Sequence, residues 1–298
     1  MAKQRVEVPE SFRALRRWQR EGEAGARWLR SLPDLIASLC LQWGLVVDGR
    51  PRHGDNALIV PVRRGGEPLV LKVSWPDEMV AEHADALWLW DAQGTVQLVD
   101  ADIDAGALLL ERLDASVTLR NLPVEQAAPI IGGILRRLAR PASGGYRTTA
   151  DLAAELQTSL PERWRVVGRP LARRTLDAAV GLAGELSAGG PEALVDRNLD
   201  YGVVLRAERE PWLVIDPLAL MGDPEYVCGQ LLWARVDELD DDRAVRWCLG
   251  LIADAAELDR DKATSWAVLR AVDYWLSGLA AGLTEDPVRC QRIVWALL

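Results

Sequence analysis

The sequence predicts an α+β protein with two lobes, a small lobe built on an antiparallel sheet and a larger helical lobe after it. Two observations indicate this. Short β-branched runs separated by turn residues gather in the first part of the chain, whereas the rest shows mostly amphipathic helical spacing. At 298 residues the chain is long enough for two joined lobes with a substantial core. We expect the lobes to comprise residues 1–112 and 113–298.

The N-terminal lobe begins with helical spacing over residues 8–45, and Pro33 is expected to kink or split this stretch. A second helix is expected over 77–90, with Pro76 near its first turn. The remaining elements are short strand-like runs that we interpret as an antiparallel meander, at residues 45–49, 57–62, 69–73, 96–99 and 107–110.

The C-terminal lobe is predicted to be mainly helical, with one β-rich hairpin inside it. Amphipathic spacing predicts helices over 124–138, 149–159 and 170–188, and again from about 225 to the end. The hairpin is formed by β-branched runs at 193–196, 202–205 and 211–216. Most of the 13 Trp lie in helical patterns and are expected to be packing residues.

Composition excludes several classes of protein. The formal charge of −9, without a sustained basic stripe, argues against a nucleic-acid partner and suits a cationic small molecule better. No apolar run reaches eighteen residues, so no membrane partner is expected, and the charged N-terminus lacks the apolar core of a secretory signal. Four scattered cysteines without CxxC spacing argue against a zinc site and indicate a cytoplasmic location.

Four segments carry a family resemblance, and a fifth near the C-terminus, Val272–Leu279, supports it. In chain order the four are Val70–Pro76, Ala107–Asp114, Val195–Leu205, and Trp212–Pro217 with its continuation Gly222–Glu225. Together they resemble the aminoglycoside and hydroxyurea phosphotransferase family, particularly its streptomycin-kinase-like branch. The resemblance implies a protein-kinase-like fold, ATP and Mg²⁺ as cofactors, and O-phosphorylation of an antibiotic or another small polar metabolite.

On the nucleotide side, the resemblance implies that Lys72 contacts the α- and β-phosphates of ATP. The family places a Glu on the next helix to hold this lysine, but His83 occupies that position here. Glu82 or Asp85 are the acids that can substitute. The alternative for Lys72 is a surface lysine on an edge strand.

Two further segments are implied to contact the nucleotide. Residues 53–56, His-Gly-Asp-Asn, occupy the place of the family's phosphate-covering loop, although a plain hairpin turn explains them equally well. Residues 110–113 correspond to the hinge, whose backbone groups meet the adenine edge, so Glu111 and Leu113 are expected among the cofactor-binding residues.

Asp216 follows a predicted strand and precedes Pro217. It resembles the metal-binding Asp of the family, which has the role of the Asp in the DFG motif of protein kinases. An Asp at the end of a strand can also simply cap a turn. Its position after the catalytic loop favours a metal ligand.

The catalytic loop departs from the family pattern. The branch reads Asp-Arg-Asp-Leu-His-Tyr-Gly-Asn, whereas this chain reads Asp-Arg-Asn-Leu-Asp-Tyr-Gly-Val over residues 196–203. Asn198 therefore holds the position of the base, Asp200 that of the central His, and Val203 that of the magnesium-binding Asn.

These changes predict impaired phosphotransfer. An amide cannot accept a proton at neutral pH, so Asn198 forfeits base assistance worth about 10²–10⁴ in rate, although it can still orient a hydroxyl. Val203 supplies no oxygen to a hard cation. Asp200 is expected to face the same side as Asn198, and Asp196 or Asp200 is the candidate acid or base if the pocket performs other chemistry.

The acceptor is expected to meet acidic residues in the helical lobe. Asp223 and Glu225, just after Asp216, are the candidates, whereas residues 240–242 are interpreted as a solvated helix end. Three functions follow from these patterns: an impaired small-molecule kinase, a pseudokinase that binds a small molecule, and a repurposed enzyme of secondary metabolism without phosphoryl transfer.

Overall fold

The structure is a computed structural model that describes residues 6–142, 145–190 and 193–298. Internal contacts divide the chain into two compact units, a first unit that ends at Leu113 and a second that begins at Asp114. Within the described residues, none of the helices combines the length and the apolar character needed to cross a bilayer.

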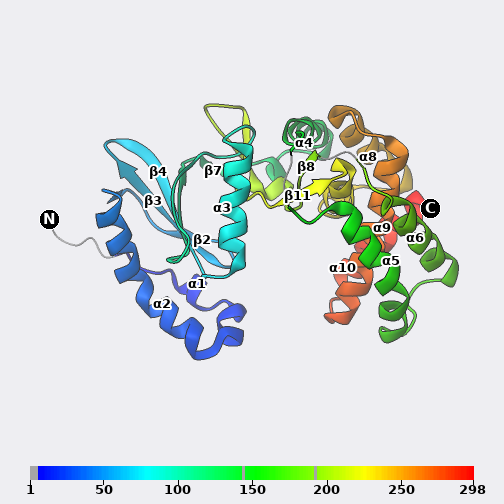
Figure 1. Cartoon of the computed structure of the whole chain (residues 1–298), viewed down its shortest axis with the longest axis horizontal. Helices are drawn as coiled ribbons and strands as arrows, with labels where there is room; N and C mark the ends of the chain where they lie inside the picture. The colour runs from blue at the N-terminus through cyan, green and yellow to red at the C-terminus, as the bar shows by residue number, and fades with distance from the viewer. Residues whose placement is uncertain (1–5, 143–144, 191–192) are drawn as a thin grey trace. The chain divides into compact units, whose positions relative to one another are not determined.

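The first unit is an antiparallel sheet accompanied by helices (Figure 1). Its helices are α1 (Glu10–Arg13), α2 (Arg16–Gln42) and α3 (Glu78–Trp90). Its strands are β1 (Val46–Val47), β2 (Arg52–His53), β3 (Ala57–Arg64), β4 (Glu67–Ser74), β5 (Leu98–Asp102) and β6 (Ala107–Glu111). The strand order is β1-β3-β4-β6-β5, with β2 also paired to β3, and every pairing is antiparallel. The predicted antiparallel sheet is confirmed.

Alternation along β4 separates the two faces of this sheet. Leu69, Leu71 and Val73 are buried in the core that the sheet shares with the apolar stripe of α2. Because side chains alternate in a strand, the intervening Lys72 points to the opposite face. There its Nζ lies 3.3 Å from Nδ1 of His83, a buried residue of α3.

The break in the N-terminal helical stretch lies at Gly22 and not at Pro33, so the predicted kink at Pro33 is wrong. Gly22 has φ 58° and ψ −136°, whereas the backbone stays helical through Pro33. A proline removes one backbone N–H, and the helix continues through Pro33 where its apolar stripe shares a core with the sheet. Gly22 adopts a conformation that a Cβ would oppose, which makes it the natural breaking point.

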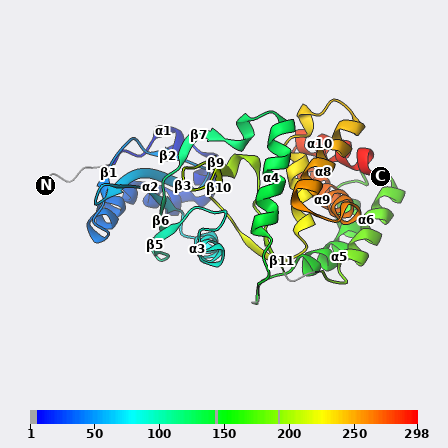
Figure 2. The ribbon, with the colours of Figure 1, turned by 90° about the horizontal axis from the view of Figure 1, so that it is seen from above.

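The second unit is mostly helical (Figure 2). Its α-helices are α4 (Val124–Leu138), α5 (Thr149–Val166), α6 (Arg173–Leu186), α7 (Cys228–Trp233), α8 (Asp242–Ala256), α9 (Arg260–Ala280) and α10 (Glu285–Leu297). Short 3₁₀ turns are η1 (Leu119–Asn121), η2 (Tyr201–Val203), η3 (Pro224–Val227) and η4 (Val236–Glu238). The predicted helical second part of the chain is confirmed.

Two small ladders lie among these helices. One has the order β10 (Trp212–Val214), β9 (Val204–Arg206) and β7 (Asp114–Thr118), and the other pairs β8 (Ala193–Asp196) with β11 (Ala219–Gly222). The sequence pattern did not predict β7 or β11, because β7 is half polar and β11 is only four residues long. β11 nevertheless matters for function, since its pairing with β8 fixes the start of the loop at residues 196–203.

Helices α4 and α8 approach closely at Gly132, which allows a matched test of packing. A Cβ at Gly132 would lie 2.6 Å from the carbonyl oxygen of Ile252 and 2.8 Å from Cβ of Ala255, whereas a Cβ at Gly133 meets nothing within 4 Å. We expect Gly132→Ala to lower the free energy of unfolding by about 1–3 kcal/mol. Gly133→Ala should raise it by up to about 1 kcal/mol through helix propensity. Urea unfolding of both variants checks this, and two changes of the same sign would contradict the close approach.

Candidate functional site

The loop at residues 196–203 is fastened to the segment that follows β10. Oδ1 of Asp196 accepts hydrogen bonds from the backbone N–H groups of Asn198 and Leu218, each at 3.0 Å. The N–H of Ile215 donates to the carbonyl of Val203 at 2.9 Å. The structure therefore brings the predicted catalytic loop beside the predicted metal ligand, Asp216.

Asn198 is oriented by this arrangement. Its Nδ2 donates to the backbone carbonyl of Asp216 at 2.7 Å. The donor half of the amide is thereby committed, and the amide oxygen is left as the group that can accept a hydrogen bond from a substrate hydroxyl. An aspartate in this place would set a carboxylate oxygen against that same carbonyl, so the amide and the local backbone suit each other.

Asp200 is neutralised by an arginine that the sequence analysis did not single out. Nη2 of Arg120 lies 3.0 Å and 3.3 Å from the two carboxylate oxygens of Asp200. One of these oxygens also accepts the backbone N–H of Gly202 at 2.7 Å, which caps η2. The carboxylate is thus engaged by a cation and by the backbone. Asp200 and Asn198 were expected to share one side of the loop, and both line the cavity described below.

The residues around Asp216 do not reproduce the family's magnesium site. Asp216 is half buried and follows β10, and Val203, with an alkyl side chain, holds the position where the family has an oxygen ligand. Among the described residues no group of three His, Cys, Asp or Glu side chains is arranged to hold a metal ion. Asp216 stays a predicted ligand, and the donor set of the described residues does not fit a tightly held magnesium ion.

Asp196 is a fully buried carboxyl group. Burial raises its pKa to about 7, and the charge of Asp216 adds to the rise, while the N–H donors of Leu218 and Asn198 offset part of it. Its Oδ2 is buried and has no hydrogen-bond partner. The carboxyl group therefore favours the protonated form in the folded protein, and its evident task is to hold the loop.

This raised pKa predicts how stability depends on pH. A carboxyl whose folded pKa exceeds its unfolded value binds protons more tightly when folded, so its contribution is complete below about pH 4 and is lost as the pH rises to about 7. From pH 5 to 8 the wild type should lose about 2–3 kcal/mol more of its free energy of unfolding than Asp196→Asn. Asp240→Asn, at an exposed position, is the charge-matched control. Parallel pH profiles for the wild type and Asp196→Asn would refute the assignment.

A cavity of about 630 Å³ opens beside the loop, wholly within the second unit. Its polar lining comprises Arg120, Asn198, Asp200, Gln230, Ser277 and Asp286. Its apolar and aromatic lining comprises Val203, Trp233, Tyr274, Gly278, Ala281 and Leu283. The three altered loop positions therefore face one cavity. Tyr274 and Ser277 lie in the C-terminal segment Val272–Leu279, which supports the family resemblance. That resemblance is the sequence signal that could have identified these two residues as part of the cavity lining.

In the first unit, His83 takes the position beside Lys72 that the resemblance gives to an acid. His83 is 3% exposed, whereas Glu82 and Asp85 are exposed residues of α3. Since both lysine and imidazolium are cations, the 3.3 Å contact requires a neutral imidazole whose Nδ1 accepts the ammonium proton. An imidazole therefore lies beside Lys72 at the position where the resemblance expects a carboxylate.

The other predicted nucleotide residues lie at ordinary structural positions. Residues 53–56 form the turn between β2 and β3, where Nε2 of His53 is 2.7 Å from Oγ of Ser11. Glu111 ends β6 and accepts the N–H of Gln97 at 3.1 Å, and Leu113 is half buried at the end of the unit. Their contact with a nucleotide stays a prediction.

The predicted acceptor residues Asp223 and Glu225 do not line the cavity. Asp223 is 1% exposed, and its carboxylate accepts hydrogen bonds from Nζ of Lys262 at 2.6 Å and Nε1 of Trp266 at 3.0 Å. Glu225 is also buried, and burial raises its pKa. Both oxygens of Asp223 are used inside the protein, which indicates a structural role. Asp241, as expected for a helix end, caps α8 by accepting the N–H of Ala244.

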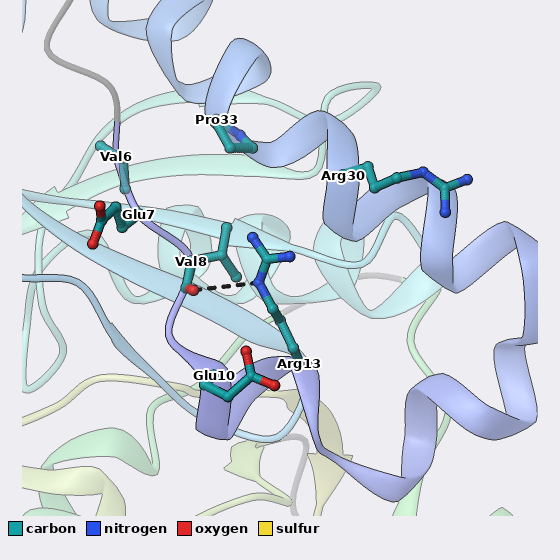
Figure 3. A pocket seen from close by; sticks show the side chains of 7 residues that line it. All are labelled: Val6, Glu7, Val8, Glu10, Arg13, Arg30 and Pro33. Carbon is teal, nitrogen blue, oxygen red and sulfur yellow. Dashed lines mark hydrogen bonds between the residues drawn. The ribbon is translucent and has the colours of Figure 1, made fainter.

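A second hollow, of about 690 Å³, lies in the first unit beside the described residues that precede α1, which we call the N-terminal arm (Val6–Pro9; Figure 3). Figure 3 shows Arg13 reaching back to the arm, where its Nε donates to the carbonyl of Val8 at 3.4 Å. Val6 and Val8 are part of the core under α2. None of the predicted site residues lines this hollow.

Comparison with known proteins agrees with this geometry. Residues 42–279 match the family described as aminoglycoside/hydroxyurea antibiotic resistance kinase. Streptomycin 6-kinase of Streptomyces glaucescens is 36% identical over 285 residues, which cover 93% of this chain and 92% of the relative. Hydroxyurea phosphotransferase of Kitasatospora aureofaciens is 37% identical over 285 residues, 93% of this chain and 82% of the relative.

A solved structure confirms the predicted protein-kinase-like fold. It is a thermostable mutant of aminoglycoside phosphotransferase APH(4)-Ia in ternary complex with AMP-PNP and hygromycin B. The TM-score is 0.61 at 16% identity, and the match covers 87% of this chain and 97% of that chain. The resemblance found in four sequence segments is therefore upheld over nearly the whole chain.

Proposed function

Because this chain belongs to the aminoglycoside/hydroxyurea antibiotic resistance kinase family, we propose that it transfers phosphate from ATP to a hydroxyl group of a small polar molecule, slowly. The relatives are named for phosphorylation of streptomycin and hydroxyurea. The acceptor of this chain is an antibiotic or a related small metabolite.

The observation that carries the proposal is the convergence of Asn198, Asp200 and Val203 on one cavity of about 630 Å³. That volume suits a small-molecule ligand. Asn198 meets the ligand at the point where the family's base acts, and its amide oxygen can accept and orient the hydroxyl proton. Orientation is the part of the mechanism that phosphoryl transfer depends on most, because the protein does little covalent work.

Two deficits explain why the reaction should be slow. Asn198 holds the hydroxyl but cannot take its proton, which forfeits about 10²–10⁴ in rate. Val203 removes the second oxygen ligand for magnesium, and Asp200 is not a ready substitute because Arg120 holds both of its carboxylate oxygens. The chain's own residues therefore bind and position the acceptor more completely than they activate it.

A pseudokinase is the second candidate, and Val203 favours it. A protein that binds the acceptor without transferring phosphate keeps the cavity but needs no magnesium ligand. Calorimetry with ATP and Mg²⁺ distinguishes the two functions. Magnesium-dependent binding of ATP is expected for the kinase, and its absence at millimolar ATP would contradict the proposed phosphotransfer.

Val203→Asn tests the metal deficit directly. The backbone of residue 203 is bonded to Ile215, the neighbour of Asp216, and we expect an amide oxygen at position 203 to complete the pair of ligands. We expect the apparent affinity for ATP in saturating Mg²⁺ to rise by about tenfold, because one charge-assisted ligand is worth about 1.4 kcal/mol or more. Val203→Leu, which adds volume but no oxygen, should leave the affinity unchanged. An equal response from both variants would contradict the position assigned to the metal.

A further inference from the structure

The carboxylates that line the cavity of the second unit are already paired with arginines. Asp200 is held by Arg120 at 3.0 Å and 3.3 Å. Asp286 lies 3.5 Å from Nη1 of Arg289, and Nε of the same arginine is 2.6 Å from Asp237. Within the described lining, therefore, each carboxylate already has an arginine beside it, with which a cationic group of a ligand would compete.

The aromatic residues of the cavity are occupied in the same way. The guanidinium of Arg289 lies 5.4 Å from the ring centre of Trp233, and that of Arg270 lies 4.4 Å from the ring centre of Tyr274. Arg270 also donates to the hydroxyl of Tyr274. An aromatic face attracts a cation through its quadrupole, but here arginines of the protein already use these rings.

Apart from Arg120 and the two paired carboxylates, the polar groups of the described lining are uncharged. The amide oxygen of Asn198 is left after Nδ2 binds the Asp216 carbonyl. The side-chain oxygen of Gln230 accepts from Tyr274 at 3.4 Å, which leaves its NH₂ group as a donor. Ser277 accepts a hydrogen bond from Arg163 at 2.5 Å, so its own proton can be donated. These groups recognise hydroxyl and carbonyl oxygens.

We infer that the acceptor of this site is an uncharged, hydroxyl-bearing molecule with an apolar face, and not an oligocationic aminoglycoside. The inference rests on the proposed function, which makes this cavity the acceptor site. Val203, Ala281 and Leu283 supply the apolar wall that such a face contacts. A cationic ligand would have to compete with Arg120 and Arg289 for these carboxylates, so its charge gains less affinity than it would from unpaired carboxylates.

Ligand-observed NMR on the full chain without nucleotide tests the inference. The library contains equal numbers of uncharged hydroxylated aromatic fragments and of cationic amines of similar size. A fragment is counted as a cavity ligand if it shows binding to the wild type and no binding to Ala281→Trp. Residue 281 is an exposed position of the lining, where an indole fills the opening of the cavity. Uncharged fragments should outnumber cations among them by at least about threefold. A majority of cations, or no ligand lost in Ala281→Trp, overturns the inference.

Arg289→Gln provides the charge test. It frees Asp286 and Asp237 and removes the cation from Trp233. Streptomycin, an oligocation, should bind this variant at least about tenfold more tightly than the wild type in calorimetry. Arg260→Gln is the control, because Arg260 forms an exposed ion pair with Asp254 at the other end of α9 from Tyr274 and Ser277. Equal affinity of wild type and Arg289→Gln, whether strong or weak, overturns the inference.

The failure of this inference can be told apart from a failure of the proposed function. Both binding experiments omit ATP, so they report on the cavity even in a protein that transfers no phosphate. ATP-dependent phosphorylation of streptomycin by the wild type would preserve the kinase and overturn the uncharged acceptor. If ATP did not bind but uncharged fragments bound in the cavity, the proposed kinase would be overturned and the uncharged acceptor site would be preserved.

Discussion

The double variant Asn198→Asp/Val203→Asn should phosphorylate a suitable acceptor at least about a hundredfold faster than the wild type. The change restores a proton acceptor and an oxygen ligand beside Asp216 at the same time. Asn198→Asp alone should gain little, because the second oxygen ligand for magnesium is still absent while residue 203 is valine. Since both positions act on one transition state, their effects should be non-additive.

The measurement is ADP release with a panel of hydroxylated antibiotics that includes charged and uncharged members. Asn198→Ala/Val203→Asn is the control, because it restores the ligand without a proton acceptor. A wild-type protein already as fast as the double variant would show that there is no impairment. If no protein in the series is active, the calorimetry with ATP separates a wrong acceptor from a lost nucleotide site.

Arg235→Ala is expected to have the largest effect on stability, about 3–5 kcal/mol off the free energy of unfolding. The side chain is 1% exposed and donates to the carbonyls of Arg120 at 3.2 Å and Leu122 at 2.7 Å. Its guanidinium also lies 5.1 Å from the ring centre of Tyr201. Its loss leaves two carbonyls without their donor and a void beside a buried ring.

Glu238→Gln separates this packing role from the ion pair. Arg235 also lies 2.6 Å from Glu238, whose side chain is 48% exposed. Because Glu238 is half exposed and a glutamine can still accept a hydrogen bond from Arg235, Glu238→Gln should cost less than about 1 kcal/mol. Urea unfolding followed by tryptophan fluorescence measures both variants. Similar losses in the two variants would mean that the ion pair, and not the bonds to the backbone, is what Arg235 contributes.

The architecture could be predicted from the sequence because the spacing of apolar residues shows which side chains are buried. Strand-like runs at 57–62 and 69–73 became β3 and β4, and the apolar spacing at 124–138 became α4 with the same bounds. Pro33 misled because its own chemistry predicts a kink, whereas the helix continues through it where its apolar stripe shares a core with the sheet. β11 escaped because four residues carry too little pattern to identify a strand.

The site was only partly readable. The loop positions Asn198, Asp200 and Val203 stand in one contiguous motif, so their meeting at one cavity follows from their order. Arg120 and Arg289 come from elements far away in the sequence, and an arginine in a helix gives no sign of the carboxylate it will meet. The acidic residues after Asp216 were predicted to meet the acceptor, whereas Asp223 is engaged by Lys262 and Trp266. Those two residues lie some forty positions further on, so the sequence around Asp223 gives no sign of them.

The pair formed by Arg120 and Asp200 also restricts the order in which this loop can change. Returning residue 200 to the histidine of the family, by itself, would leave a guanidinium beside the cavity with no anion opposite it and would remove the oxygen that caps η2. Replacing Arg120 first would leave a carboxylate that has lost its cation. Changing either residue alone leaves one charge without its partner, whereas changing both together leaves neither charge unpaired and costs only the cap of η2. Residues 120 and 200 are therefore coupled, and each limits the substitutions that the other position tolerates.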